Sequence, residues 1–289
     1  MITPDSKLPR RSLFAMLPAL LSACSGVDFL NATVPTDTYQ RTAGLSYGPD
    51  PRQRLDLYRP VKQVGNAPLV VFFYGGSWSS GERGDYRFVG EALASQGIVT
   101  LVADYRLSPE FRYPAFVQDS AKAVRWAFDH AAHHGADPAR VFVMGHSAGA
   151  YNAAMVALDG RWLASEGMKP AQLAGWIGLA GPYDFLPIVD RQTQVAFDWP
   201  NTPRDSQPLS HASRASPPAL LLAPVNDRVV SPQRSTTAMA QRLREQGVRV
   251  EAELFDSVSH VTLLAAMASV LRGRAPVLER VSVFVRSIG

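Results

Sequence analysis

Residues 141–154 read VFVMGHSAGAYNAA, an apolar run that turns into a helical pattern across a serine set between two glycines. Residues 141–144 have the continuous apolarity of a strand covered on both faces, and the residues after Ala148 are typical of a helix. Residues 145–149 then follow the carboxyl end of a strand, where open parallel sheets gather their functional groups. The stretch therefore predicts a mainly parallel sheet wrapped by helices, with Ser147 at its functional edge.

The same alternation of apolar runs and helical patterns extends along most of the chain. We expect strands at 54–58, 69–73, 98–103, 141–144, 176–179, 219–223 and 248–254, and helices near 85–96, 115–134, 148–159, 232–246 and 262–272. The first of these strands alternates polar and apolar residues and fits an antiparallel edge, and the last also lies nearer an edge. With 289 residues, 46% of them hydrophobic, the chain can form one large domain.

The N-terminus has the layout of an export signal. KLPRRSLFAMLPALLSAC at 7–24 joins a basic start to a short apolar stretch and ends in small residues and a cysteine. The apolar stretch is shorter than the roughly 20 residues that a membrane-spanning helix needs. The paired arginines leave open whether export follows the general or the twin-arginine route. LSAC at 21–24 resembles a bacterial lipobox, in which the cysteine is acylated and becomes the new N-terminus.

Cys24 is the only cysteine, and a lone cysteine forms no internal disulfide, so lipid attachment accounts for it. The alternative is a plain cleaved signal with an incidental cysteine. We expect residues 1–23 to be a lipoprotein-type signal peptide, 24–42 a tether, and 43–289 the folded domain. By resemblance, Ser25 after the cysteine favours the outer membrane of a bacterial envelope, facing the periplasm. The net charge of +4 is small and the basic residues are scattered, which argues against nucleic acid as a partner.

The serine between glycines has a chemical explanation. A serine that turns sharply from strand to helix exposes its hydroxyl in a strained backbone conformation, and glycine at 145 and 149 removes collisions with the neighbouring strand and helix. The helix N-terminus also directs amide groups to the place where negative charge would develop. The stretch is therefore typical of a nucleophile elbow.

A serine nucleophile needs a base, and the base needs an acid. His260 in FDSVSHVTLL follows the last expected strand, and Asp227 in LLLAPVNDRVV follows the strand before it. The order Ser147, Asp227, His260 is the one expected for this kind of sheet. Asp184 and Asp256 remain rival candidates for the acid.

Acyl transfer also needs donors for an oxyanion. YGGSW at 74–78 follows an expected strand, and the amides of Gly75 and Gly76 would complement that of Ala148, each worth roughly 3 to 4 kcal/mol. The alternative is that these glycines form an ordinary turn. No group of histidines, acidic residues or cysteines has metal-ligand spacing, and no phosphate-binding loop is present, so we expect no cofactor.

Three aromatic residues are candidates for substrate binding. Tyr74 and Trp78 flank the paired glycines, and His146 lies inside the elbow but too close in sequence to turn onto Ser147. Trp78 is either a wall of the acyl pocket or a core aromatic residue. Residues 181–210 interrupt the alternation of strands and helices, and we expect them to form a small cap over the pocket, although an ordinary surface excursion is the alternative.

Residues 45–289 are similar to α/β-hydrolases of the esterase/lipase and bacterial esterase–kynurenine formamidase group. Besides the elbow, the resemblance rests on residues 71–78, on DYRLSPE at 104–110 with YPA at 113–115, and on Asp119. Such families usually have histidine where Tyr74 stands. The resemblance implies an α/β-hydrolase fold and hydrolysis of small carboxylic esters without metal or cofactor.

Three functions are compatible with the sequence. A carboxylesterase acting on small esters is the first, and an arylformamidase-type amidase using the same residues on an N-formyl group is the second. A non-catalytic binding module is the third, although a binding role would not require Ser147, Asp227 and His260 together. The sequence does not indicate an oligomeric state.

Overall fold

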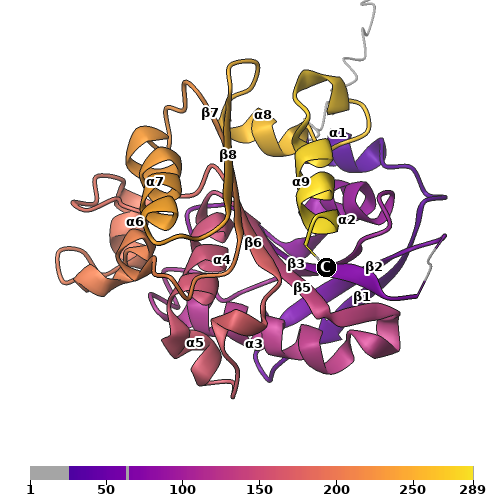
Figure 1. Cartoon of the computed structure of the whole chain (residues 1–289), viewed down its shortest axis with the longest axis horizontal. Coiled ribbons are helices and arrows are strands. Elements are labelled where there is room, and N and C mark those ends of the chain that lie inside the picture. Colours follow the sequence, from indigo (N-terminus) through magenta and orange to yellow (C-terminus); the bar gives the residue numbers. More distant parts are fainter. Residues whose placement is uncertain (1–25, 63–64, 289) are drawn as a thin grey trace, which may run out of the picture.

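The computed structural model describes residues 26–62 and 65–288. Its centre is one eight-stranded sheet with the order β1-β2-β4-β3-β5-β6-β7-β8 (Figure 1). β2 pairs antiparallel with β1 and with β4, and all other neighbours pair parallel. The predicted fold class, a mostly parallel sheet flanked by helices, is confirmed.

Every predicted strand and helix has a counterpart in the structure. The strands are β1 (Tyr39–Ser46), β2 (Arg54–Pro60), β3 (Ala67–Phe73), β4 (Val99–Ala103), β5 (Ala136–His146), β6 (Gly175–Leu179), β7 (Ala219–Pro224) and β8 (Val250–Phe255). The α-helices of the described residues are α1 (Gly26–Ala32), α2 (Arg87–Ala94), α3 (Ala115–His130), α4 (Ala148–Leu158), α5 (Gly160–Ala164), α6 (Arg191–Ala196), α7 (Ala238–Glu245), α8 (His260–Ala265) and α9 (Val277–Arg286). However, α8 ends seven residues before the end of the helix expected near 262–272, and β1, α1, α5, α6 and α9 were not predicted.

Residues 24–42 are not the tether that we expected, as far as they are described. α1 occupies Gly26–Ala32 with Leu30 buried, and β1 begins at Tyr39 and pairs with β2. An edge strand is hydrogen-bonded on one side and half exposed, so the polar composition that suggested a tether does not prevent pairing. The sheet therefore begins before residue 43. The predicted signal peptide and Cys24 lie outside the described residues.

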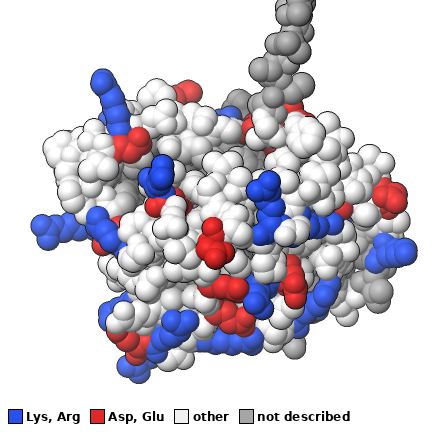
Figure 2. All heavy atoms as spheres, turned by 90° about the horizontal axis from the view of Figure 1, so that it is seen from above, with Lys and Arg blue, Asp and Glu red and all other residues white. Residues whose placement is uncertain are grey.

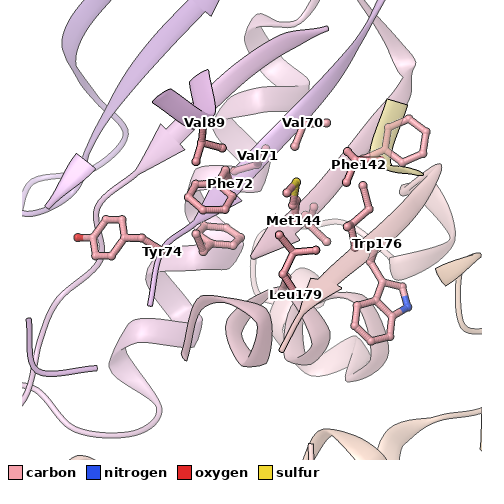
Figure 3. Close-up of a cluster of buried hydrophobic side chains, with 14 of the residues drawn as sticks. Val70, Val71, Phe72, Tyr74, Val89, Phe142, Met144, Trp176 and Leu179 are labelled. Atoms are coloured by element: carbon pink, nitrogen blue, oxygen red, sulfur yellow. The ribbon is translucent and has the colours of Figure 1, made fainter. Parts of the chain in front are cut away.

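The helices form a layer on each face of the sheet. α2 and α9 pack together on one face, while α3, α4 and α7 lie on the other (Figure 1). The sheet's inner residues are continuously apolar and fully buried, as in Val70 and Phe72 of β3, Phe142 of β5 and Trp176 of β6 (Figure 3). This two-sided burial is the physical reason that short apolar runs, rather than alternating ones, form the central strands.

The strand register brings four loops to one edge of the sheet. Phe73 at the end of β3 lies beside Gly145 near the end of β5, and Leu179 at the end of β6 lies beside His146. Pro224 of β7 is likewise paired with the last residue of β8. The segments that follow β3, β5, β7 and β8 therefore leave the sheet at the same level, and every predicted catalytic residue lies in one of them.

The surface at this end carries both signs of charge. Figure 2, which looks onto the top of Figure 1, shows Lys and Arg side chains interspersed with Asp and Glu side chains between wide uncharged areas. Among residues 26–62 and 65–288, no helix is both long enough and apolar enough to cross a membrane.

Candidate active site

Ser147 stands between β5 and α4 in a strained backbone conformation. Its φ of 54° and ψ of −121° lie outside the regions that residues with a side chain commonly adopt. The Ser147 amide donates to the carbonyl of Leu179 at 2.9 Å, which anchors the turn to β6. The sharp turn directs the side chain out of the sheet, as expected for a nucleophile elbow.

The two glycines of the elbow are required by close backbone approach. A Cβ on Gly145 would lie 2.1 Å from the Gly149 carbonyl oxygen, and a Cβ on Gly149 would lie 2.0 Å from that of Phe73. Both distances are far below any real contact of a Cβ atom, and the clashing atoms are backbone. Any side chain at either position would therefore push α4 away from the sheet.

Three residues from separate loops meet at the elbow. His260 Nε2 lies 2.9 Å from Ser147 Oγ, and His260 Nδ1 lies 2.7 Å from Asp227 Oδ2. Because a carboxylate only accepts, Nδ1 carries the proton and Nε2 is free to accept the proton of the serine hydroxyl. The structure thus brings together the serine, base and acid positions that the sequence predicts.

The Asp227 carboxylate is held by its own loop. Its Oδ1 accepts hydrogen bonds from the amides of Val229 at 2.8 Å and Val230 at 3.1 Å. Although burial raises the pKa of Asp227, hydrogen bonds from His260 and from these two amides outweigh it and lower the pKa below its usual range. The carboxylate is therefore ionised at neutral pH and oriented toward the imidazole.

The rival acids do not reach His260. Asp184 Oδ2 instead accepts from Arg234 at 3.0 Å, and Asp256 is exposed on the loop before α8. Asp184, Asp227 and Asp256 all lie near a strand end in the sequence. Only the loop of Asp227 directs its carboxylate to His260.

His146 supports the histidine loop from inside the elbow. Its buried Nε2 donates to the backbone carbonyl of His260 at 2.8 Å, and the two imidazole rings lie 5.0 Å apart. Burial, followed by the charge of His260, lowers the pKa of His146 to about 3. A neutral ring at this position holds the loop and places no positive charge beside His260 when that residue takes up a proton.

Replacing His146 with glutamine is expected to change the pH dependence of stability. The unfolded chain protonates His146 below its ordinary pKa of 6.5, whereas the folded chain does so only near 3. Between these values the free energy of unfolding falls with decreasing pH, by about 1.4 kcal/mol per unit from this group. Glutamine keeps an N–H donor but does not titrate. Urea unfolding at pH 4, 5, 6 and 7 should therefore give a shallower decline for the variant, and parallel curves would contradict this account.

The loop after β3 places Gly75 and Gly76, which the sequence predicts as oxyanion donors, beside Ser147. A Cβ on Gly75 would lie 3.0 Å from Ser147 Cβ, and Gly76 has a φ of 119°, which residues with side chains rarely adopt. Ala148 is the first residue of α4, where an amide has no acceptor within the helix. Ser77, with a φ of 49°, continues this strained loop past the serine.

Tyr74 does not belong to the substrate-binding surface, contrary to our expectation. Its ring is fully buried between Tyr86 and Tyr105, and its hydroxyl points away from the apolar cluster of Figure 3. That hydroxyl donates to Asp104 at 2.8 Å and accepts from Arg52 at 2.7 Å. Tyr74 therefore anchors the base of the loop to a buried polar network.

Trp78 and the predicted cap line a cavity of about 430 Å³ beside Ser147. Trp78 is only 3% exposed, donates from Nε1 to Asn152 at 3.0 Å and stacks on Phe185 of the cap segment. It is thus both a wall of the pocket and part of the core. Ile188, also in residues 181–210, completes this wall, so the segment covers the site as expected. We call this space the cap cavity.

A second cavity of about 300 Å³ also reaches Ser147 and shares Ser77 and Val229 with the cap cavity. Val27 and Leu30 of α1, Leu264 of α8, and the edge of His146 line it. We call it the α1 cavity. Sequence reasoning missed α1, although the apolar residues at 27 and 30 have helical spacing. Among the described residues, no group of three or more histidines, cysteines or acidic residues could hold a metal ion.

Comparison with curated proteins identifies esterases. The chain is 28% identical over 241 residues to a probable isoprenylcysteine alpha-carbonyl methylesterase of Arabidopsis thaliana, covering 76% of this chain and 50% of that protein. It is 32% identical over 229 residues to esterase LipC of Mycobacterium tuberculosis, covering 71% and 56%. The chain thus spans about half the length of these relatives.

Solved structures share the architecture. A truncated carbohydrate esterase from gut microbiota superposes with a TM-score of 0.75 at 16% identity, covering 88% of this chain and 98% of that one. Esterase B from Lactobacillus rhamnosis gives a TM-score of 0.76 at 21% identity, covering 91% of each chain. The BD-FAE family model matches residues 55–243, which contain the turn at Ser147, the loop after β3 and Asp227. Because that match spans more than half of the chain, the protein belongs to the BD-FAE family and has the α/β-hydrolase fold.

Proposed function

We propose that the protein is a serine hydrolase that cleaves small carboxylic esters through an acyl-enzyme intermediate. The observation that carries this proposal is the continuous hydrogen-bonded chain from Asp227 through His260 to Ser147, with two cavities that reach the serine. The printed names of the relatives, which are esterases, support the same reaction class.

The first half of the reaction transfers the acyl group to the protein. His260 Nε2 takes the proton of Ser147 Oγ while that oxygen forms a bond to the ester carbonyl carbon. The resulting oxyanion accepts hydrogen bonds from the amides of Gly75, Gly76 and Ala148. His260 then gives its proton to the alcohol oxygen as the C–O bond breaks, and the alcohol leaves.

The second half returns the protein to its starting state. His260 takes a proton from water, the hydroxide oxygen bonds to the acyl carbon, and the bond to Ser147 Oγ breaks as that oxygen regains a proton from His260. Asp227 fixes the imidazole tautomer and stabilises the imidazolium in both halves. Water supplies the hydroxyl group of the acid, and its other proton replaces the one that the leaving alcohol received. The reaction therefore needs no oxidant or reductant.

The substrate class can be tested with the soluble chain lacking residues 1–24. We expect turnover of methyl and aryl esters with short acyl chains, measured as acid release, and little turnover of N-formylkynurenine. Dominant hydrolysis of the formamide would favour the amidase alternative. No turnover of either class would favour a binding module.

We also propose that Cys24 is lipidated and that the protein is anchored at the outer membrane, facing the periplasm. The support is the lipobox-like sequence at 21–24 and the absence of any other cysteine in the sequence.

Replacing Cys24 with serine is expected to move the protein from the membrane fraction to the soluble fraction of fractionated bacterial cells. The anchor is then lost because serine has no thiol to acylate. Immunoblotting of washed membranes measures the distribution. Substitution of Ser22 with alanine, which leaves the thiol in place, is the control and should remain in the membrane fraction. Unchanged partition of the Cys24→Ser protein would contradict the anchor.

A further inference from the structure

Ser147 lies at the junction of two cavities with different walls. The cap cavity extends from Ser147 toward Trp78, Phe185 and Ile188. The α1 cavity extends from the same serine toward α1 and α8. An ester bond placed at Ser147 Oγ therefore has one substituent on each side, and each substituent meets a separate cavity.

The position of the base distinguishes the two sides. His260 lines the α1 cavity and is not among the residues that line the cap cavity, whereas Ser77, Ser147 and Val229 line both. The leaving alcohol must receive its proton from His260 Nε2 within hydrogen-bonding distance. The alcohol side of the ester must therefore face the α1 cavity, and the acyl side faces the cap cavity.

The walls of the α1 cavity define the chemistry of the alcohol. Beyond the catalytic edge, the cavity is lined mainly by apolar side chains, among them Val27, Leu30, Phe88 and Leu264, and Tyr86 adds an aromatic ring with one hydroxyl. Its volume of about 300 Å³ is at the lower end of the range for ligand pockets. An apolar alkyl or aryl alcohol larger than methanol would bury its surface here, and a polyol would lose more hydrogen bonds to water than the single Tyr86 hydroxyl could replace.

α1 is fixed in place by side-chain hydrogen bonds as well as by packing. The Asn31 amide donates to the carbonyls of Gly84 and Asp85, at 3.0 Å each. Ser269 beyond α8 donates to the carbonyl of Thr33 at 3.2 Å, and Leu30 is 8% exposed. These contacts join α1 to the turn before α2 and to the segment after α8, so the helix has a fixed position at the cavity.

We propose that α1 forms the specificity-determining wall of a subsite for the apolar leaving alcohol. This inference rests on the proposed ester hydrolysis. It adds that α1 selects the alcohol part of the ester. The acyl group is selected independently by the cap segment.

The test uses two ester series and one variant in each cavity. Val27→Trp, at a half-buried position on α1, should lower kcat/KM for 1-naphthyl acetate at least about tenfold more than for methyl acetate. The same variant should retain the wild-type profile for methyl esters of rising acyl length. Ile188→Trp in the cap cavity should change the profile for methyl esters of rising acyl length and keep the wild-type ratio of kcat/KM between 1-naphthyl acetate and methyl acetate.

Two further variants complete the design. Phe29→Trp adds bulk on the same helix at a position that is 58% exposed and should leave both series unchanged. Val27→Ala should raise the rate on 1-naphthyl acetate relative to methyl acetate, which keeps the test decisive where tryptophan prevents folding. An unchanged alcohol series, or an altered acyl series, in folded Val27 variants overturns the inference. Absence of Ser147-dependent turnover in the unmodified chain overturns the proposed function instead.

Discussion

Replacing Ser147 with alanine is expected to lower kcat for ester hydrolysis by about four to six orders of magnitude. The variant lacks the oxygen that forms the acyl-enzyme, while the oxyanion amides and both cavities remain. KM should change much less than kcat because substrate still occupies the two cavities. Steady-state hydrolysis of an aryl acetate measures the loss, and a burst experiment on the unmodified chain measures acyl-enzyme formation directly.

Folding of the Ser147→Ala protein is the necessary control. The strained φ of 54° is unfavourable for serine and alanine alike, so little change in stability and no change of fold are expected. Circular dichroism and urea unfolding should show a cooperative transition like that of the unmodified chain. A folded variant that retains most of its turnover would rule out Ser147 as the nucleophile.

Replacing Asp227 with asparagine is expected to lower kcat by about four orders of magnitude near neutral pH. An asparagine amide can donate to His260 Nδ1 and so favour the tautomer in which Nε2 carries the proton. That tautomer cannot accept the proton of the Ser147 hydroxyl. Because the pKa of Asp227 is lowered, the unmodified carboxylate stays ionised throughout pH 5 to 9, and kcat measured over this range compares the variant with a fully charged Asp227.

Asp184→Asn is the matched control for Asp227→Asn. Both changes remove one carboxylate charge on neighbouring loops, but Asp184 pairs with Arg234 at the surface and not with His260. The Asp184 variant should therefore retain kcat within a few-fold. Equal losses in the two variants would contradict the assignment of the acid.

The candidate catalytic residues could be predicted because their positions follow from strand ends. Ser147 follows β5, Asp227 follows β7 and His260 follows β8, and parallel strands bring the residues after them to one edge of the sheet. Asp184 also follows a strand, and only the three-dimensional direction of its loop, which leads to Arg234, separates it from Asp227. The position of a residue after a strand predicts that it lies at this edge of the sheet. The direction of its loop decides which of the two acids contacts His260.

The α1 cavity and the role of Tyr74 could not be predicted in the same way. α1 has seven residues, too few for a clear periodic signal, and it is held by bonds from Asn31 to backbone carbonyls that sequence patterns do not encode. Tyr74 stands next to Gly75, so its sequence position suggests the pocket. Its ring turns inward because Asp104 and Arg52 offer buried partners for its hydroxyl.

The strand order of the sheet also governs how the protein folds. The two strands of each parallel pair are separated in the sequence by at least one helix. β2 pairs with β4, although β3 lies between them in the sequence. Bringing such distant segments together costs conformational entropy before the strand contacts form. Refolding is therefore expected to be slow compared with that of helical proteins of similar size. Intermediates with β7 or β8 undocked would keep much of the core but hold Asp227 and His260 away from Ser147. Enzymatic activity should therefore return last, after secondary structure, and report on complete assembly of the sheet.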